Sequence, residues 1–347
     1  MGQQKRFPDD KRELNISDIY LFHRINSIYD MNILHNKGFI LFALIIAHFF
    51  SSELFAQTAR KTGTEYYTKE HAPLHLINTG EVELGVRYKK GQGVPIVFIH
   101  GSWDDHNSWI SVAEQLTGKV TNPIVVYDRR GHSTSTPDTK QGTISMDVQD
   151  ALSLLRTLGF EKAHFIGHSY GANIAVEIAN TYANHVESIV IYEPPIFGLL
   201  KGKAQYKEML NEVQAEMQKS KQLLEKGNIE LGTFNFIENV AFGKGSWCSI
   251  FDERARNTMV ASYRTWLDQA NDPERLNIRP ENLNQFKKPI TLITGGSSIA
   301  VYPAVAKEIK DKVEHIQLHT IEGAGHGGLV SHPQETAEII LKHLAGF

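Results

Sequence analysis

The chain has 347 residues, of which 41% are hydrophobic and 22% charged, and its formal net charge is −3 at pH 7. These values are typical of a soluble globular protein with room for one large domain and an insertion. The sequence has no basic excess and no dense Lys/Arg stripe, which argues against nucleic-acid binding. The single cysteine, Cys248, excludes an intrachain disulfide and is expected to be a buried small hydrophobe. No cysteine–histidine cluster has zinc spacing, so we expect no metal.

Residues 1–57 are predicted to be an N-terminal extension that ends in a signal peptide. The apolar run at 38–50 is too short to span a bilayer comfortably, and it follows Lys37 as the h-region of a secretory signal does. The segment before Met31 is too polar and too long for such a signal, so we expect translation to start at Met31. We predict export to the periplasm or the exterior, with cleavage near Gln57 and no stable membrane insertion afterwards. The alternative is a membrane anchor through residues 38–50.

Beyond this extension, short β-branched runs alternate with amphipathic stretches. The runs expected to be strands are 81–88, 95–100, 123–127, 163–166, 188–192, 290–294 and 315–320. Helical periodicity is expected over residues 146–158, 172–183 and 333–344. Alternation of this kind predicts an α/β protein with a doubly wound, mostly parallel sheet.

One long segment breaks this alternation. Residues 196–285 are polar and rich in helical patterns, and no strand signal stands out among them. We expect a helical cap, inserted between two core strands. Residues 58–195 and 286–347 are then the first and second parts of the core.

The strongest chemical signal is the pattern Gly-His-Ser-Tyr-Gly at residues 167–171. It matches G-x-S-x-G and lies between a predicted strand and a predicted helix, which is the context of a nucleophile elbow. Ser169 is therefore the candidate nucleophile, at a helix N-terminus that favours developing negative charge. The backbone N–H groups of Tyr170 and Ser102 are expected to form the oxyanion hole. His326, in a glycine-rich loop after the last strand, is the candidate base.

Further motifs accompany the elbow. In chain order they are H-G-S-W at 100–103, D-R-R-G-H-S at 128–133, G-H-S-Y-G at 167–171, Y-E-P-P at 192–195 and G-A-G-H at 323–326. Together they resemble the α/β-hydrolase superfamily over roughly residues 70–347, and most closely its lidded serine-nucleophile subgroup with the acid in the E-P-P motif. The resemblance implies the α/β-hydrolase fold, with a mostly parallel eight-stranded sheet and a helical cap. It also implies a structural role for Arg129 and Arg130, below the site.

The acid of the catalytic triad departs from the commonest family pattern. That position usually follows the strand here written PITLITG, but no Asp or Glu occurs between Glu281 and Glu308, and Ser297 occupies the slot. A neutral hydroxyl cannot orient the base as a carboxylate does. Glu193, at the end of the preceding core strand, is our candidate acid. The alternative is a Ser–His dyad without an acid.

These residues predict acyl transfer through an acyl-enzyme, without a metal or an organic cofactor. A small carboxylic ester is the first hypothesis for the substrate. The alternatives are a C–C bond hydrolase, a cofactor-free haloperoxidase and a non-catalytic ligand receptor. Trp103, Phe242 and Trp247 are the candidate substrate-binding residues. The alternative is that the aromatic residues of the cap segment form the cap's own core.

Overall fold

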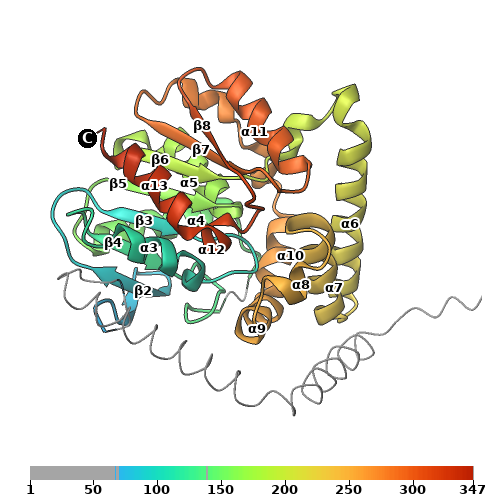
Figure 1. Ribbon diagram of the computed structural model, residues 1–347. Helices are drawn as coiled ribbons and strands as arrows, with labels where there is room; N and C mark the ends of the chain where they lie inside the picture. Colours follow the sequence, from blue (N-terminus) through green and yellow to red (C-terminus); the bar gives the residue numbers. More distant parts are fainter. Residues whose placement is uncertain (1–66, 68–69, 138–139, 347) are drawn as a thin grey trace, which may run out of the picture. The chain divides into compact units, whose positions relative to one another are not determined.

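A computed structural model describes residue 67, residues 70–137 and residues 140–346 (Figure 1). The predicted signal peptide and the alternative anchor at residues 38–50 lie outside this part of the chain. Within it, no helix combines the length and the apolar character that crossing a membrane requires.

The core of the protein is one sheet of eight strands. In chain order these are β1 (Leu74–Asn78), β2 (Glu83–Lys89), β3 (Ile96–Ile99), β4 (Ile124–Tyr127), β5 (Ala163–His168), β6 (Val186–Tyr192), β7 (Ile290–Gly295) and β8 (Gln317–Ile321). Their order in the sheet is β1-β2-β4-β3-β5-β6-β7-β8. Strand β2 pairs antiparallel with both β1 and β4, whereas all other neighbours are parallel. The predicted eight-stranded, mostly parallel sheet is therefore confirmed.

Helices cover both faces of this sheet, as the alternation of buried residues along β3 makes clear. Val97 and Ile99 belong to one apolar cluster, whereas Ile96 and Phe98 belong to another, because successive strand residues point to opposite faces. The helices that contribute to the first cluster are α4 (Ile144–Thr157), α5 (Tyr170–Thr181) and α11 (Val301–Lys312). Those that contribute to the second are α3 (Ile110–Leu116) and α13 (Pro333–Leu344) (Figure 1).

Every described element between β6 and β7 is helical, and we call this segment the cap. The α-helices there are α6 (Lys207–Glu225), α7 (Ile229–Phe236), α8 (Ser246–Ser249), α9 (Glu253–Ala261) and α10 (Tyr263–Asn271). A π-helical turn, Ile237–Ala241, continues α7. Short helical turns occur at His106–Trp109, Ala183–His185, Phe197–Leu200, Ala204–Tyr206, Glu274–Asn277, Pro280–Asn284 and α12 (Gly328–Ser331).

The cap has an apolar core of its own, which we call the cap cluster. Its residues are Leu224, Phe236, Ile237, Val240, Ala241, Trp247, Phe251, Met259 and Trp266, and they are joined by Trp103 from the loop after β3. The cap is also tied to the core by hydrogen bonds, since Asp272 accepts from the backbone N–H of Ile144 at 2.8 Å. The expectation for Cys248 was wrong, because its side chain on α8 is exposed.

Candidate active site

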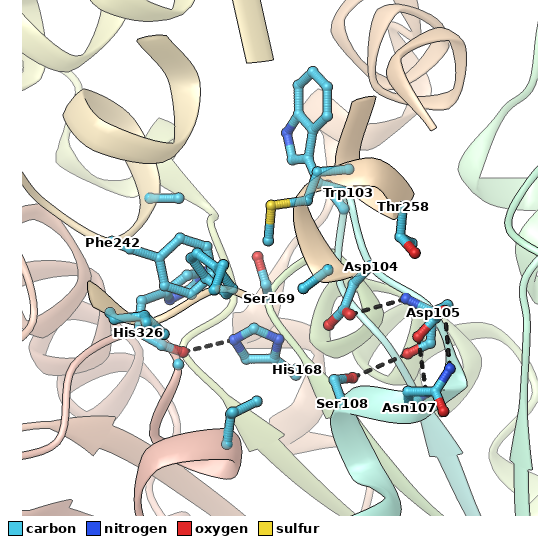
Figure 2. Close-up of a pocket in the computed structure, with 18 of the residues that line it drawn as sticks. Trp103, Asp104, Asp105, Asn107, Ser108, His168, Ser169, Phe242, Thr258 and His326 are labelled. Carbon is cyan, nitrogen blue, oxygen red and sulfur yellow. Dashed lines mark hydrogen bonds between the residues drawn. The ribbon is translucent and has the colours of Figure 1, made fainter. Parts of the chain in front are cut away.

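Loops that follow β3, β5, β6 and β8 meet at the edge of the sheet formed by the carboxyl ends of the parallel strands. Ligands of open α/β sheets bind at this edge. A pocket of about 180 Å³ lies there, and its lining includes Ser169, His168 and His326 from the core together with Phe242 and Met259 from the cap (Figure 2).

Ser169 lies on a sharp bend between β5 and α5, and its backbone has a left-handed φ of 52°. Such a conformation is strained for a residue with a side chain, and it persists only where neighbouring structure enforces it. Close packing around the bend holds the Ser169 backbone in this conformation. A Cβ at Gly171 would lie 2.2 Å from the carbonyl oxygen of Ile99, and a Cβ at Gly167 would lie 2.2 Å from the carbonyl oxygen of Gly171. The two glycines of the G-x-S-x-G pattern thus allow the backbone contacts that form the elbow.

His326 and Glu193 are in direct contact. The Nδ1–H of His326 donates to Oε2 of Glu193 at 2.7 Å, and both side chains are buried. The other carboxylate oxygen, Oε1, accepts from the Thr294 hydroxyl at 2.9 Å and from the Gly295 backbone N–H at 2.8 Å. Thr294 and Gly295 end strand β7, so the strand that usually precedes the acid here supplies two donors that hold the carboxylate of Glu193.

The imidazole of His326 is enclosed by other rings. The phenol of Tyr302 stacks on it, with centroids 3.9 Å apart and planes at 19°. His168 holds the backbone of this loop, because its Nε2–H donates to the carbonyl oxygen of His326 at 2.7 Å. Burial lowers the pKa of His168 well below its usual value, so this imidazole is a neutral donor.

Ser169 and His326 line the same pocket, although no hydrogen bond joins the Ser169 hydroxyl to His326. Such bonds are often long in ligand-free active sites and tighten when substrate binds. The site therefore brings together a serine hydroxyl, an imidazole and a carboxylate, which are the groups that a nucleophile, a base and an acid require.

The predicted oxyanion loop lies beside the elbow. A Cβ at Gly101 would be 3.0 Å from the Cβ of Ser169, so the two segments pack as closely as their backbones allow. Tyr170 begins α5, and its N–H is one of the first in the helix, which have no partner within the helix. Arg129 holds the loop from below: it donates to the carbonyl oxygen of Gly101 at 3.0 Å and pairs with Asp147 at 3.1 Å.

The cap also contacts this loop. The Ser102 hydroxyl donates a hydrogen bond to Oε1 of Gln269 on α10. Trp103 has a left-handed φ of 65°, and its indole stacks on that of Trp266, with centroids 5.4 Å apart. Two consecutive residues of the oxyanion loop are thus fixed by cap helix α10.

The predicted substrate-binding residues separate into two groups. Trp103 and Phe242 line the pocket, as predicted. Trp247 does not: it is buried in the cap cluster, where its ring meets that of Phe234 at 5.9 Å. A helix of four residues is too short for its sequence to tell which of its faces points to the pocket.

Three residues of the site were not among those predicted from the sequence. Tyr302 on α11 contacts His326, and Thr294 on β7 contacts Glu193. Asp104 lines the pocket two residues after Ser102. The position of Asp104 directly after the H-G-S-W motif is the only feature of the sequence that could have indicated one of these three residues.

Among the described residues, one group has the donor atoms that a metal ion needs: Asp105, His106 and Asp128. The carboxylates of Asp105 and Asp128 and Nδ1 of His106 take part in hydrogen bonds within the protein, whereas Nε2 of His106 is buried without a partner. One oxygen of Asp128 accepts from the backbone and ring N–H groups of His106 at 2.8 Å, and the other accepts from Thr134 at 2.6 Å. We therefore assign this group a structural role, in holding the loop that follows β3.

The family model described as alpha/beta hydrolase family matches residues 96–339. The chain belongs to the alpha/beta hydrolase family. This hydrolase is 24% identical to the sn-1-specific diacylglycerol lipase ABHD11 of Mus musculus, over 72% of its own chain and 80% of the lipase. It is 23% identical to a proline iminopeptidase of Lactobacillus helveticus, over 74% of its chain and 91% of the peptidase.

Solved structures resemble the hydrolase over most of the chain. A thermophilic esterase from Thermogutta terrifontis superimposes with a TM-score of 0.63 at 18% sequence identity, covering 79% of this chain and 99% of the esterase. At this identity the likeness concerns the fold alone. Relatives that act on such different bonds identify the protein as a hydrolase without identifying its substrate.

Proposed function

We propose that this hydrolase cleaves small carboxylic esters through an acyl-enzyme, with Ser169 as nucleophile, His326 as base and Glu193 as acid. The observation that carries the proposal is the meeting of a strained serine at the β5–α5 elbow and a buried His326–Glu193 pair at one pocket. A buried carboxylate on Nδ1 keeps the imidazole in the tautomer whose Nε2 accepts a proton, and it stabilises the imidazolium that results.

The proposed reaction has two halves. His326 takes the proton of the Ser169 hydroxyl as the serine oxygen attacks the ester carbonyl, and the oxyanion is held by the N–H groups of Ser102 and Tyr170. The alcohol then leaves with the proton from His326. Water, activated by the same imidazole, attacks the acyl-enzyme, releases the acid and restores Ser169. No metal or organic cofactor takes part in these steps.

The pocket walls support an ester with a modest apolar group. Phe242, Phe251 and Met259 of the cap line one side of the pocket, and Ile250 and Val330, which are 40% and 45% exposed, lie at its mouth. An apolar side of this kind accommodates the hydrocarbon part of an ester, while polar side chains elsewhere on the wall orient the ligand. A lipase and an esterase among the similar proteins support the same choice.

The test is turnover of p-nitrophenyl butanoate together with labelling by a fluorophosphonate, followed by identification of the labelled peptide. We expect label on Ser169, and we expect Ser169→Ala to lose the label and about 10⁴-fold or more in kcat. Ser297→Ala, which removes another hydroxyl after a core strand, serves as the control and should retain both. Label on another residue, or turnover by Ser169→Ala, contradicts the proposal. If the protein cleaves a diketone faster than the p-nitrophenyl ester, a C–C bond hydrolase is favoured instead. If it binds these compounds without turnover, a ligand receptor is favoured.

A further inference from the structure

A carboxylate projects into the pocket next to the proposed reaction centre. Asp104 follows the oxyanion loop, and its backbone carbonyl accepts from the Nδ1–H of His132 at 2.9 Å, which fixes the backbone at this point. Figure 2 shows the Asp104 carboxylate and the Ser169 hydroxyl directed into the same space. A ligand that reaches Ser169 therefore also meets Asp104.

This carboxylate has no cation of its own. Within residues 70–137 and 140–346, no lysine, arginine or histidine forms an ion pair with Asp104. The donors beside it are the backbone N–H of Asp105, at 2.9 Å, and the hydroxyl of Ser108. Burial and, next in size, the neighbouring Asp105 carboxylate together raise the pKa of the Asp104 carboxyl to about 7. A partly buried carboxylate without a countercharge is costly for the protein to keep.

The one arginine on the described pocket wall offsets the charge of Asp104 only in part, because burial and Asp105 raise the pKa of Asp104 more than Arg254 lowers it. Arg254, on α9, pairs with Asp105 at 3.4 Å, and its side chain is 57% exposed. Asp252 adds a further acid to the wall, and His168 is neutral for the reason given above. The described wall of the pocket therefore carries more negative than positive charge.

We infer that Asp104 forms a cation subsite, and that the ester substrate carries a protonated amine near its scissile bond. This inference rests on the proposed ester hydrolysis, because it concerns the same pocket. An ammonium group supplies the positive charge that the carboxylate lacks, together with further hydrogen-bond donors. Phe242 and Met259 on the cap side then contact the carbon atoms of the same substrate.

Two pairs of esters with matched shapes test the inference at pH 8. In the acyl pair, p-nitrophenyl 3-aminopropanoate has an ammonium where p-nitrophenyl butanoate has a methyl group. In the leaving-group pair, 2-(trimethylammonio)ethyl butanoate has a quaternary nitrogen where 3,3-dimethylbutyl butanoate has a carbon. We expect the wild type to favour the cationic member of at least one pair by about tenfold or more in kcat/KM.

The substitution Asp104→Asn keeps the shape of the side chain and removes its charge, so it is expected to bring that ratio to about one. Glu253→Gln, a change of the same kind on an exposed neighbouring acid that does not line the pocket, should leave the ratio as in the wild type. Equal rates within both pairs for the wild type overturn the inference, and so does a preference that survives Asp104→Asn. If no ester is hydrolysed at all, the proposed function fails instead.

Discussion

The phenol ring of Tyr302 lies face to face with the imidazole of His326, with ring centroids 3.9 Å apart. Tyr302 is itself fixed, because its side chain is buried and its hydroxyl donates to the carbonyl oxygen of Val240 in the cap. A positive charge above an aromatic face is stabilised by the electrons of the ring. The stack therefore both orients the imidazole of His326 and favours the imidazolium that the proposed mechanism forms.

Replacing Tyr302 by Leu is expected to lower kcat for p-nitrophenyl butanoate about fivefold to tenfold, with little change in KM, because the charged imidazole is present only during reaction. Tyr302→Phe keeps the aromatic face and loses only the hydroxyl, so it should stay within about twofold of the wild type. Steady-state kinetics of both variants provide the measurement. If kcat fell as much in Tyr302→Phe as in Tyr302→Leu, the hydrogen bond to Val240 would be the important interaction, and the stack would not.

Glu193 is expected to be indispensable for the reaction, since among the residues that the structure describes it is the one carboxylate that pairs with His326. Glu193→Gln should reduce kcat by up to about 10⁴-fold, as in other triads that lose their acid. Thr294→Val removes one of the two donors to Oε1 and leaves the Gly295 N–H in place, so a smaller loss, about tenfold, is expected. Nearly normal turnover by Glu193→Gln would mean that a Ser–His dyad works without an acid.

The close packing at the elbow predicts a stability difference between two glycines. Gly171→Ala places a Cβ 2.2 Å from the Ile99 carbonyl oxygen, so we expect a loss of about 2 kcal/mol or more and a Tm lower by about 5 °C or more. Gly198→Ala is the control, because a Cβ there has no atom within 4 Å. Thermal unfolding of both variants tests the argument, and equal Tm values would contradict it.

Asp104 predicts a pH dependence of stability. Burial raises the pKa of its carboxyl from 3.8 to about 7, so between these pH values the folded state binds more protons than the unfolded state, and stability from this group falls as pH rises. The charged and titratable groups that face it are Asp105, Arg254, His168 and His326. Since Asn has no charge to bury, Asp104→Asn should raise the Tm at pH 8 and have little effect near pH 4.

The measured quantity is the Tm of the variant minus that of the wild type at each pH, so that other titrating groups cancel. Glu253→Gln removes a solvated carboxylate and should give a difference that does not change with pH in this way. A difference for Asp104→Asn that is the same at pH 4 and pH 8 would show that the carboxyl keeps its ordinary ionisation.

Most of the sheet could be predicted from the sequence because its strands are buried. All four residues of β3 and of β4 are buried, so their apolar runs are continuous and easy to recognise. Strand β1 was missed for the opposite reason: its side chains are mostly exposed, with Leu76 60% exposed, and no apolar run marks it. Edge strands of this kind are specified by pairing with their neighbour rather than by their own pattern.

The site could be predicted where one short motif contains the whole constraint. The elbow is local, and Ser169 follows from five consecutive residues and their flanks. Tyr302 contacts His326 from another element, so no spacing reveals the stack. Trp247 was misplaced because its helix, α8, has only four residues, too few for a periodicity that distinguishes the cap's interior from the pocket.

The hydrogen bond from Ser102 to Gln269 and the stack of Trp103 on Trp266 join the proposed anion-stabilising backbone to cap helix α10. The same Trp266 packs against Phe236, which lines the pocket, so a change on α10 that alters this part of the wall also disturbs the loop on which the rate depends. Selectivity and speed are therefore not independent variables in this enzyme. Variants with altered substrate preference should be sought at the pocket mouth, at Ile250 and Val330.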